Sequence, residues 1–452
     1  MSDPRILPLE GTGQHFPEFA ALHELRPERY PFLLQSTATS AKLGRSEMLF
    51  AFPGDAIELS SSAGAEPDTA DGSFLGALDA AFARERVAIQ DEISPFRGGW
   101  FLYLGYELAA EIEPGLDFYS DPLLPRAFAV RCPAALIRDL DTGAVSLMIE
   151  AGAEIDVASV RDDLAMLSEL DTEGASISVT GIHEEPPEVF LQAVETGKRH
   201  IARGDIYQAN LSREWRVDTA YPVSSAALFR RLARANPAPF AGLLRWGTTS
   251  VVSSSPERLV NVRGRQVSTR PIAGTRPRSG DPAEDESLRR ELLENAKERS
   301  EHVMLIDLER NDLGRLCAPG SVEVDEFMVL ESYAHVHHIV SNVRGDLRDD
   351  VSPGQVIAAV FPGGTITGCP KVRCMQIIGE LEASVRGAYT GSFGYLNRDG
   401  TLDLNILIRS IVLSDTGATF RAGSGIVADS IPAAELEETR AKAKGMLRVF
   451  LQ

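Results

Sequence analysis

Short apolar runs separated by turn residues fill the first 170 residues of the chain. The runs are rich in aromatic and branched side chains, which is typical of strands in an antiparallel sheet. Apolar residues at helical spacing appear over residues 79–86 and 160–170, where we predict helices. The predicted strands are Pro31–Leu34, Met48–Phe52, Gly99–Tyr103 and Phe128–Cys132.

The segment over residues 171–187 interrupts this pattern. It is acidic, rich in small residues and closed by two prolines, a composition typical of a linker. We therefore expect an N-terminal region over residues 1–170, a linker over 171–187 and a second region over 188–452.

Beyond the linker, strand and helix patterns alternate. Phe190, Val194 and Ile201 have helical spacing, and Gly204 with Asp205 is a stop signal. The predicted strands are Ile206–Trp215, Thr249–Ser254, His337–Val343, Ala388–Leu396, Leu404–Leu413 and Thr419–Ala422, and the predicted long helices are Glu284–Leu305 and Ile431–Leu451. This order predicts an α+β fold with large antiparallel sheets packed face to face and helices on the outside.

Composition and charge restrict the kinds of partner. The 452 residues carry a formal net charge of −20, which would repel nucleic acid and anionic membranes. We see neither a signal-peptide core nor a run of roughly 20 apolar residues, so we expect no nucleic-acid binding and no membrane span. The four cysteines lack the density of a disulfide framework and the spacing of a zinc site, so we expect reduced thiols in a cytoplasmic protein.

Two pairs of glutamates stand out on the predicted long helices. Glu298 and Glu301 lie three residues apart on the first, and Glu435 and Glu438 lie three apart on the second. Like charges at this spacing destabilise a helix by a few tenths of a kcal/mol, and two facing pairs would repel each other more strongly unless a cation lay between them. Carboxylates, waters and an anionic ligand suit Mg²⁺. The alternative is that these are solvated acidic faces.

Three further segments combine charge with a constrained backbone. Residues 270–278 hold three arginines around Ala273, a glycine and Thr275, which suits either an anion-binding loop or a surface turn. Arg409 lies in a predicted apolar strand and needs a carboxylate partner, from a substrate or from the protein. Glu257 follows a predicted strand; in a closed, partly apolar cleft its pKa would rise and it could exchange protons, whereas at an exposed turn it would not.

Several long motifs after about residue 190 resemble those of the chorismate-utilising enzymes, which include anthranilate, aminodeoxychorismate, isochorismate and salicylate synthases. The motifs are Phe361–Lys371, Ile408–Ser410, Ala422–Ser430 and Glu435–Arg440. The resemblance implies an anthranilate synthase component I-like fold with chorismate as the substrate.

The resemblance also implies individual roles. Arg409 and Tyr389 would hold a substrate carboxylate, and Glu257 would be the general acid for the departing ring hydroxyl. His338 would lie near the enolpyruvyl group. The other implied groups are the substrate-binding Gly423, Gly425, Lys442 and Thr365, the catalytic Thr275, and the magnesium ligands Glu298, Glu301, Glu435 and Glu438.

The choice among members of the family depends on a few positions. Gln208 occupies the place of a lysine that activates water in isochorismate and salicylate synthases; an amide is no general base, so ammonia is the expected nucleophile. The sequences of Tyr207–Leu211 and Ser255–Arg258 resemble the corresponding motifs of aminodeoxychorismate synthase component I. Ala273 departs from it, because many of those enzymes have a nucleophilic lysine there and anthranilate synthases have alanine.

The resemblance therefore favours formation of 4-amino-4-deoxychorismate, for para-aminobenzoate and folate synthesis. The alternative is an anthranilate synthase component I that makes anthranilate and pyruvate, and a more remote one is a catalytically silent scaffold. Either enzyme implies a separate glutamine amidotransferase subunit that supplies ammonia. Leu34, Gln35 and Ser36 resemble the segment with which anthranilate synthases bind tryptophan, although Gln35 replaces a glutamate.

Overall fold

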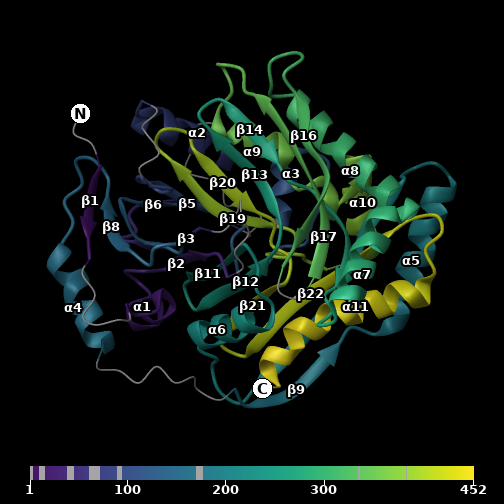
Figure 1. Ribbon diagram of the computed structural model, residues 1–452, viewed down its shortest axis with the longest axis horizontal. Coiled ribbons are helices and arrows are strands. Elements are labelled where there is room, and N and C mark those ends of the chain that lie inside the picture. Colours follow the sequence, from purple (N-terminus) through teal and green to yellow (C-terminus); the bar gives the residue numbers. More distant parts are fainter. Residues whose placement is uncertain are drawn as a thin grey trace.

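The computed structural model describes residues 4–9, 16–37, 45–60, 72–88, 94–168, 177–333, 336–382 and 384–451. Two large antiparallel sheets pack against each other, and helices cover their outer faces (Figure 1). The predicted α+β class and the face-to-face packing of the sheets are therefore confirmed.

The first sheet has twelve strands and combines segments from both halves of the chain. Eleven of them follow one another across the sheet, and β9 (Val179–Glu184) pairs separately with β10. Their order is β1 (Arg5–Pro8), β8 (Val145–Ile149), β7 (Ala134–Asp139), β3 (Ser46–Ala51), β2 (Phe32–Gln35), β11 (Phe240–Trp246), β12 (Thr249–Ser255), β21 (Ser410–Ser414), β22 (Gly417–Ile426), β10 (Gln208–Thr219) and β18 (Gly368–Cys369).

The second sheet has ten strands, and β16 (Glu323–Ser332) pairs with β17 outside the main path. The order of the others is β15 (Ile272–Pro277), β17 (Val336–Asp346), β14 (Gln266–Thr269), β13 (Arg258–Arg263), β20 (Leu402–Asn405), β19 (Ser392–Asn397), β5 (Gly99–Leu104), β6 (Ala127–Cys132) and β4 (Ala56–Leu59).

Helices pack on both sheets. Apolar residues of α1, α4, α6 and α11 join the core on the outer face of the first sheet, and those of α2, α8 and α9 join the core on the outer face of the second. The helices are α1 (Phe19–Leu25), α2 (Phe74–Glu85), α3 (Ala109–Ile112), α4 (Val157–Ser168), α5 (Pro187–Ala202), α6 (Ser225–Ala235), α7 (Pro282–Glu294), α8 (Ala296–Gly314), α9 (Pro353–Val360), α10 (Lys371–Glu382) and α11 (Pro432–Leu447), with 3-10 turns η1 (Tyr106–Leu108), η2 (Gly364–Ile366) and η3 (Arg448–Phe450).

An aromatic core joins the two sheets. Phe32 of the first sheet stacks on Phe101 of the second with ring centroids 4.1 Å apart, and Phe50 meets Phe101 edge-on at 5.3 Å. All three rings are at most 2% exposed. Burial of each ring contributes about 1.5–3 kcal/mol, so this core holds the sheets in a fixed relation on which a site between them can depend.

Strands from before and after the expected linker are neighbours in both sheets. In the first sheet β2 pairs with β11, with Leu33 opposite Leu243, and in the second β5 pairs with β19, with Tyr103 opposite Phe393. The N-terminal residues therefore complete the same two sheets as the C-terminal ones. The division at residues 171–187 stays a prediction.

Two predicted elements are wrong because the chain breaks within them. The helix expected over 284–305 is two helices, since Asn295 is extended and its side chain accepts a hydrogen bond from the Glu298 amide to start α8. The strand expected over 404–413 ends at Asn405 and resumes at Ser410. Between them, the Ile406 amide bonds the Glu257 carbonyl, and Arg409 adopts a left-handed conformation with φ 52°.

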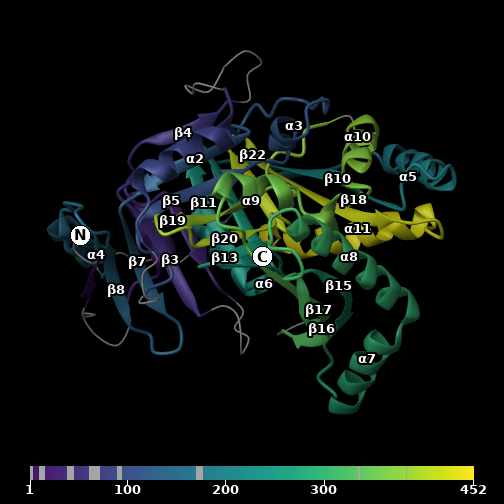
Figure 2. The same ribbon diagram turned by 90° about the horizontal axis from the view of Figure 1, so that it is seen from above.

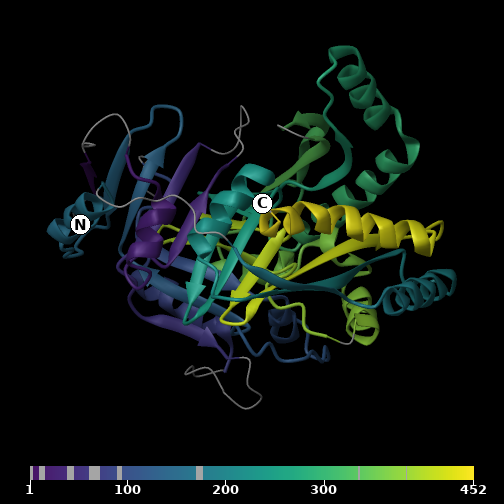
Figure 3. The same ribbon diagram turned by 90° about the horizontal axis from the view of Figure 1, so that it is seen from below.

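Two helical regions lie at the right of the molecule in Figure 1. Helices α5, α10 and α11 gather around the ends of β10, β18 and β22, whereas α7 projects from the body near β16 (Figures 2 and 3). Within the described residues, none of the helices has the length and apolar character needed to span a bilayer.

Candidate active site

Glu257 lies where the chain passes from β12 of the first sheet to β13 of the second. Its side chain is 5% exposed, and its Oε1 has no hydrogen-bond partner in good geometry. Burial raises the pKa of Glu257 to about 7, while the nearby Thr365 hydroxyl, the Ile272 backbone and the charge of Arg409 oppose the shift. A carboxyl group in this state can hold or release a proton near neutral pH.

The turn around Thr365 connects Glu257 to the first sheet. Thr365 belongs to η2, and its Oγ1 is a second buried oxygen without a hydrogen-bond partner in good geometry. One residue further, the carbonyl of Ile366 accepts a hydrogen bond from Nδ2 of Asn210 at 3.1 Å, and the backbone N–H of Asn210 donates one to the carbonyl of Thr367. The turn is thus fixed to β10, and the Thr365 hydroxyl and the nearby Oε1 of Glu257 are available to a ligand or water.

Arg409 is a half-buried cation, and it forms no ion pair with the described residues. Its guanidinium donates a hydrogen bond to Oδ1 of Asn236 at 3.3 Å. Burial lowers the pKa of Arg409 and the charge of Glu257 raises it, so the two groups sense each other. The sequence left open whether the protein itself supplies a carboxylate partner, and among the described residues none forms an ion pair with Arg409. The backbone of Arg409 is left-handed, which at a non-glycine residue is a common mark of a functional constraint.

The paired strands β10 and β22 bring four predicted residues together. A side chain at the buried Gly423 would come within 2.6 Å of the Tyr389 hydroxyl and 2.7 Å of Oδ1 of Asn210, so glycine allows both groups to close over the strand. Gly425 is exposed, and Nε2 of Gln208 lies 3.0 Å from where its Cβ would be. Gln208 therefore presents an amide, not a base, beside the exposed Gly425 at the start of β10.

A buried ionic network beneath β10 was not foreseen from the sequence. Glu382 accepts hydrogen bonds from the Ser212 amide at 2.8 Å and from Arg386 at 2.6 Å, and its other oxygen bonds Arg421 at 3.3 Å. Burial acts to raise the pKa of Glu382, but the charges of Arg386 and Arg421 outweigh it and hold that pKa below its ordinary value. Arg386 also donates to the Asn210 carbonyl at 2.7 Å, so the network holds Asn210 in place.

The segment that contains Ala273 forms β15 at the edge of the second sheet. Ala273 pairs with Ile339 and Thr275 with His338, and Gly274 between them has φ 68° and makes a bulge. Oγ1 of Thr275 lies 2.9 Å from Nδ1 of His338. Burial, followed by the charge of Arg409, lowers the pKa of His338 to about 4, so its ring is neutral at pH 7.

His337 points away from His338. Its Nε2 lies 3.0 Å from Asp285 of α7, and its Nδ1 lies 2.7 Å from the Ser332 hydroxyl. These contacts attach α7 to the second sheet and leave His338 alone on the side of Arg409. His335 falls outside the described residues.

The four predicted magnesium ligands already have protein partners. Glu298 pairs with Arg276 at 3.2 Å, Glu438 pairs with Lys442 at 2.7 Å, and Glu435 accepts a hydrogen bond from Ser424. Glu301 is half-buried and also interacts. Across the described ranges, no group of three or more His, Cys, Asp or Glu side chains is arranged to hold a metal ion. In this arrangement the glutamates do not fit a metal, and an ion would have to replace Arg276 and Lys442.

Lys442 has a second contact that differs from the predicted one. Its Nζ donates a hydrogen bond to the Gly423 carbonyl at 2.9 Å, from the second half of α11 to β22. The amine therefore lies at the strand that also carries Gly425, within a half-exposed setting. In this position it links α11 to the β10–β22 edge.

A cavity of about 420 Å³ lies away from these groups. Leu34, Gln35 and Ser36 all line it, together with Arg258 and Asp403, which form a bidentate ion pair with both distances 2.9 Å. Its volume suits a small organic ligand. The three residues predicted to form a tryptophan pocket are thus adjacent to one another and border an open space.

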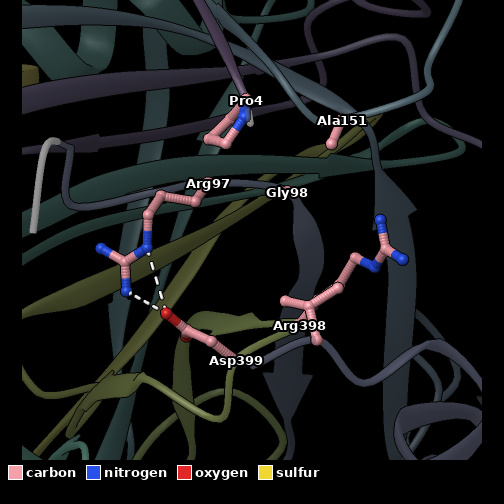
Figure 4. Close-up of a pocket in the computed structure, with 7 residues that line it drawn as sticks. Pro4, Arg97, Gly98, Ala151, Arg398 and Asp399 are labelled. Carbon is pink, nitrogen blue, oxygen red and sulfur yellow. Dashed lines mark hydrogen bonds and ion pairs between the residues drawn. The ribbon is translucent and has the colours of Figure 1, made fainter. Parts of the chain in front are cut away.

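A second hollow is much smaller. It measures about 20 Å³ and is bordered by Arg97, Gly98 and Asp399, with Arg97 paired to Asp399 at 2.6 Å (Figure 4). This is about the space of a single water molecule, so we assign it no ligand.

Known proteins are similar to this chain in both sequence and fold. The family model of chorismate binding enzymes matches residues 29–448. An anthranilate synthase component I-like protein of Synechocystis is 43% identical over 358 residues, which cover 78% of this chain and 73% of that protein. Aminodeoxychorismate synthase component 1 of Bacillus subtilis is 39% identical over 395 residues, with 84% and 83% covered.

Solved structures agree with this relationship. Anthranilate synthase component I from Streptococcus pneumoniae superposes with a TM-score of 0.78 at 28% identity, with 97% of this chain and 95% of that chain covered. The menaquinone-specific isochorismate synthase of Escherichia coli has the same fold, with a TM-score of 0.75 at 18% identity over 100% and 96% of the two chains. This chain therefore belongs to the chorismate binding enzyme family, and the site around Glu257, Arg409 and Gly423 is part of the region that the family model matches.

Proposed function

We propose that this protein is the synthase component that converts chorismate and ammonia into 4-amino-4-deoxychorismate and water. One observation carries the choice of ammonia as the nucleophile. Gln208, at the start of β10, lies against the exposed Gly425 at the position where the resemblance places the water-activating base of isochorismate chemistry. Because an amide cannot deprotonate water at neutral pH, the position supports an already nucleophilic amine, which ammonia supplies.

The chain's own residues support the steps of this reaction. Arg409, which forms no ion pair with a carboxylate of the described residues, would bind a carboxylate of chorismate through its guanidinium fork. Glu257, protonated below about pH 7, would give its proton to the ring hydroxyl, which leaves as water. Ammonia forms the new carbon–nitrogen bond and loses one proton, so the charges balance. Tyr389 and Asn210 would limit the space above Gly423.

The source of ammonia is part of the proposal. In the described structure we find no candidate for a glutaminase centre, and free ammonia is scarce at neutral pH. We therefore propose a separate glutamine amidotransferase subunit as the partner, as the resemblance implied. Magnesium remains a proposal of the same kind, and no step above depends on it.

Anthranilate synthesis is the second candidate, and Ala273 favours it. The alanine lies in β15 beside the Gly274 bulge and offers no amine for a covalent intermediate. With this small side chain, ammonia could instead add at C2 while the ring hydroxyl leaves as water, after which loss of the C2 proton and of pyruvate would give the aromatic ring. Relatives named anthranilate synthase component 1, such as that of Geobacillus stearothermophilus at 39% identity over 388 residues (80% of this chain and 76% of that protein), support the same alternative.

One product analysis distinguishes these functions. Purified protein would be incubated with chorismate, an ammonium salt and Mg²⁺, and the products separated by liquid chromatography with mass detection. We expect 4-amino-4-deoxychorismate with its enolpyruvyl group retained. Fluorescent anthranilate and free pyruvate would establish the second candidate instead. A Glu257→Gln control should consume no chorismate. If the wild type and this variant both consumed chorismate only at the same slow rate, the protein would be a catalytically silent scaffold.

The cavity beside Leu34, Gln35 and Ser36 supports a separate proposal, that of an effector site with tryptophan as the expected ligand. L-tryptophan should raise the thermal midpoint of the protein, and Ser36→Trp, which fills the cavity, should abolish that shift. No shift at any tryptophan concentration would remove tryptophan as the ligand. This experiment does not depend on the carbon that is aminated.

A further inference from the structure

The backbone turn that carries Tyr389, over residues 386–391, is joined to the segment that carries Arg409. Thr390 in this turn has φ 62° and Arg409 has φ 52°, and residues other than glycine keep such a conformation only where the surrounding structure holds them. The Thr390 amide donates a hydrogen bond to the Leu407 carbonyl at 2.8 Å, and the Leu407 amide donates one back to the turn at 2.8 Å. The backbone positions of Tyr389 and Arg409 are therefore linked.

A buried glutamate that precedes the expected linker holds the start of this turn. Glu107 lies in η1 and is 3% exposed. Its Oε1 accepts a hydrogen bond from the Arg386 amide at 2.8 Å, and its Oε2 accepts one from the Gly387 amide at 3.1 Å. The backbone N–H of the adjacent Tyr106 donates to the Gly387 carbonyl at 2.9 Å, and the Tyr389 amide bonds the Arg386 carbonyl at 3.0 Å. Glu107 thus fixes the two residues on which the backbone of Tyr389 depends.

The charge of Glu107 is connected to the same contacts. Burial raises the pKa of Glu107, whereas the hydrogen bonds from the Arg386 and Gly387 amides oppose that shift. Hydrogen bonds to a carboxylate favour its ionised form, so the turn and the carboxylate stabilise each other. The proposed reaction gives Glu107 no other role.

The side chain of Arg386 holds the turn from a different direction. Its guanidinium pairs with Glu382 at 2.6 Å and donates to the Asn210 carbonyl at 2.7 Å. It also lies 4.7 Å from the ring centroid of Tyr106 and 5.6 Å from that of Tyr389. The side chain of Arg386 is therefore held by the ionic network beneath β10, and its backbone amide is held by Glu107.

We propose that Glu107 is a positioning residue for the chorismate carboxylate site, because it fixes the backbone turn that places Tyr389 and, through Leu407, Arg409. Glu107 acts through this backbone and not on the substrate. The inference rests on the proposed function, in which Arg409 and Tyr389 bind a chorismate carboxylate, and it holds for either site of amination.

Glu107→Gln tests this role, and Glu111→Gln is the matched control. Glu111 lies nearby in the sequence, on α3, and its carboxyl group also accepts hydrogen bonds from two consecutive amides, those of Phe74 at 2.8 Å and Leu75 at 2.9 Å. Those amides belong to the start of α2. Each variant replaces one acceptor oxygen with an NH2 group, but only Glu107 bonds the turn that carries Tyr389.

The kinetic expectation is a change in KM more than in kcat. In Glu107→Gln the KM for chorismate should rise by roughly 10–100-fold, because a displacement of about 1 Å in a positioned group can cost about 100-fold. The change in kcat should be smaller, since contacts made equally in the ground state and the transition state appear in KM. Glu111→Gln should keep the wild-type KM and kcat.

A second variant keeps the test valid if Glu107→Gln does not fold. Glu107→Asp retains the charge, but its carboxylate is one methylene too short to reach both amides, so its KM should rise as well. Circular dichroism would establish that each variant is folded. An unchanged KM in a folded Glu107 variant, or an equal rise in Glu111→Gln, would overturn the inference.

Hydrogen exchange of the backbone amides, measured by mass spectrometry without chorismate, separates this inference from the proposed function. The amides of residues 386–391 should exchange faster in Glu107→Gln than in the wild type. In Glu111→Gln the faster exchange should be confined to the start of α2. Unchanged protection of residues 386–391 in Glu107→Gln would overturn the inference. If that protection is lost but the wild type consumes no chorismate, the hold of Glu107 on the turn stands and the proposed function fails.

Discussion

Replacement of Glu257 by glutamine should remove activity and at the same time stabilise the fold at alkaline pH. Burial raises the pKa of Glu257 from 4.5 to about 7. An acid whose pKa is raised on folding favours the folded state while it is protonated, and that contribution is lost as the pH rises from about 4.5 through about 7. The difference corresponds to about 3 kcal/mol, because each pKa unit is worth about 1.4 kcal/mol.

The sign of this effect makes the prediction specific. At about pH 8 the wild type must hold a carboxylate in a buried site, whereas Glu257→Gln holds a neutral amide. The stability of the variant relative to the wild type should therefore be greater at pH 8 than at pH 5 by about 2.5 kcal/mol. Urea unfolding at the two pH values, followed by circular dichroism, measures this double difference. Chorismate consumption of the variant should be lost at both.

Glu382→Gln provides a contrast of opposite sign. The pKa of Glu382 is held below its ordinary value, against the effect of burial, by Arg386 and Arg421. Its removal should destabilise the protein by about 3–5 kcal/mol at pH 8, because two buried arginines lose their shared carboxylate. If the stability difference between Glu257→Gln and the wild type were the same at pH 5 and pH 8, Glu257 would ionise as it does in the unfolded chain. The physical basis for its role as the acid would then be lost.

Three further changes test other parts of the site. Arg409→Lys loses the guanidinium fork and should lower kcat/KM for chorismate by an amount that corresponds to about 2–5 kcal/mol of lost transition-state binding energy. An unchanged kcat/KM in a folded variant would refute carboxylate binding. If Mg²⁺ replaces Arg276 and Lys442 beside the glutamates when chorismate binds, its removal by EDTA, Glu298→Gln or Glu438→Gln should each abolish turnover, and full activity in EDTA would exclude the metal. Ala273→Lys places an amine in the cleft and should give a covalent chorismate adduct, visible by mass spectrometry when ammonia is withheld; absence of the adduct would show that the site cannot present that amine.

Much of the fold could be predicted because the hydrophobic pattern is local. The runs at β2, β3, β5 and β6 gave the correct strands, since alternate residues of each face one of two apolar cores. The break at Asn295 could not be predicted in the same way. It depends on a side chain that caps α8, and a polar residue within a charged helix pattern looks the same whether or not it caps.

Arg409 shows where reasoning from the sequence was partly wrong. Its apolar neighbours Ile406 and Leu407 predicted a continuous strand, but their backbone groups bond Glu257 and Gly391 in place of a ladder partner. The predicted role of the arginine stays a prediction, and its left-handed backbone conformation does not follow from the strand pattern.

The relation between Arg409 and Glu257 links substrate binding to acid catalysis. In the free protein the positive charge of Arg409 lowers the pKa of Glu257, against the larger effect of burial. A chorismate carboxylate bound to Arg409 would compensate that charge, and a water-excluding ligand would also deepen the burial of Glu257, which disfavours its charged form. Both changes favour the protonated form of Glu257. In the proposed mechanism, the contact that holds the substrate therefore also raises the proportion of Glu257 that is ready to protonate the departing hydroxyl.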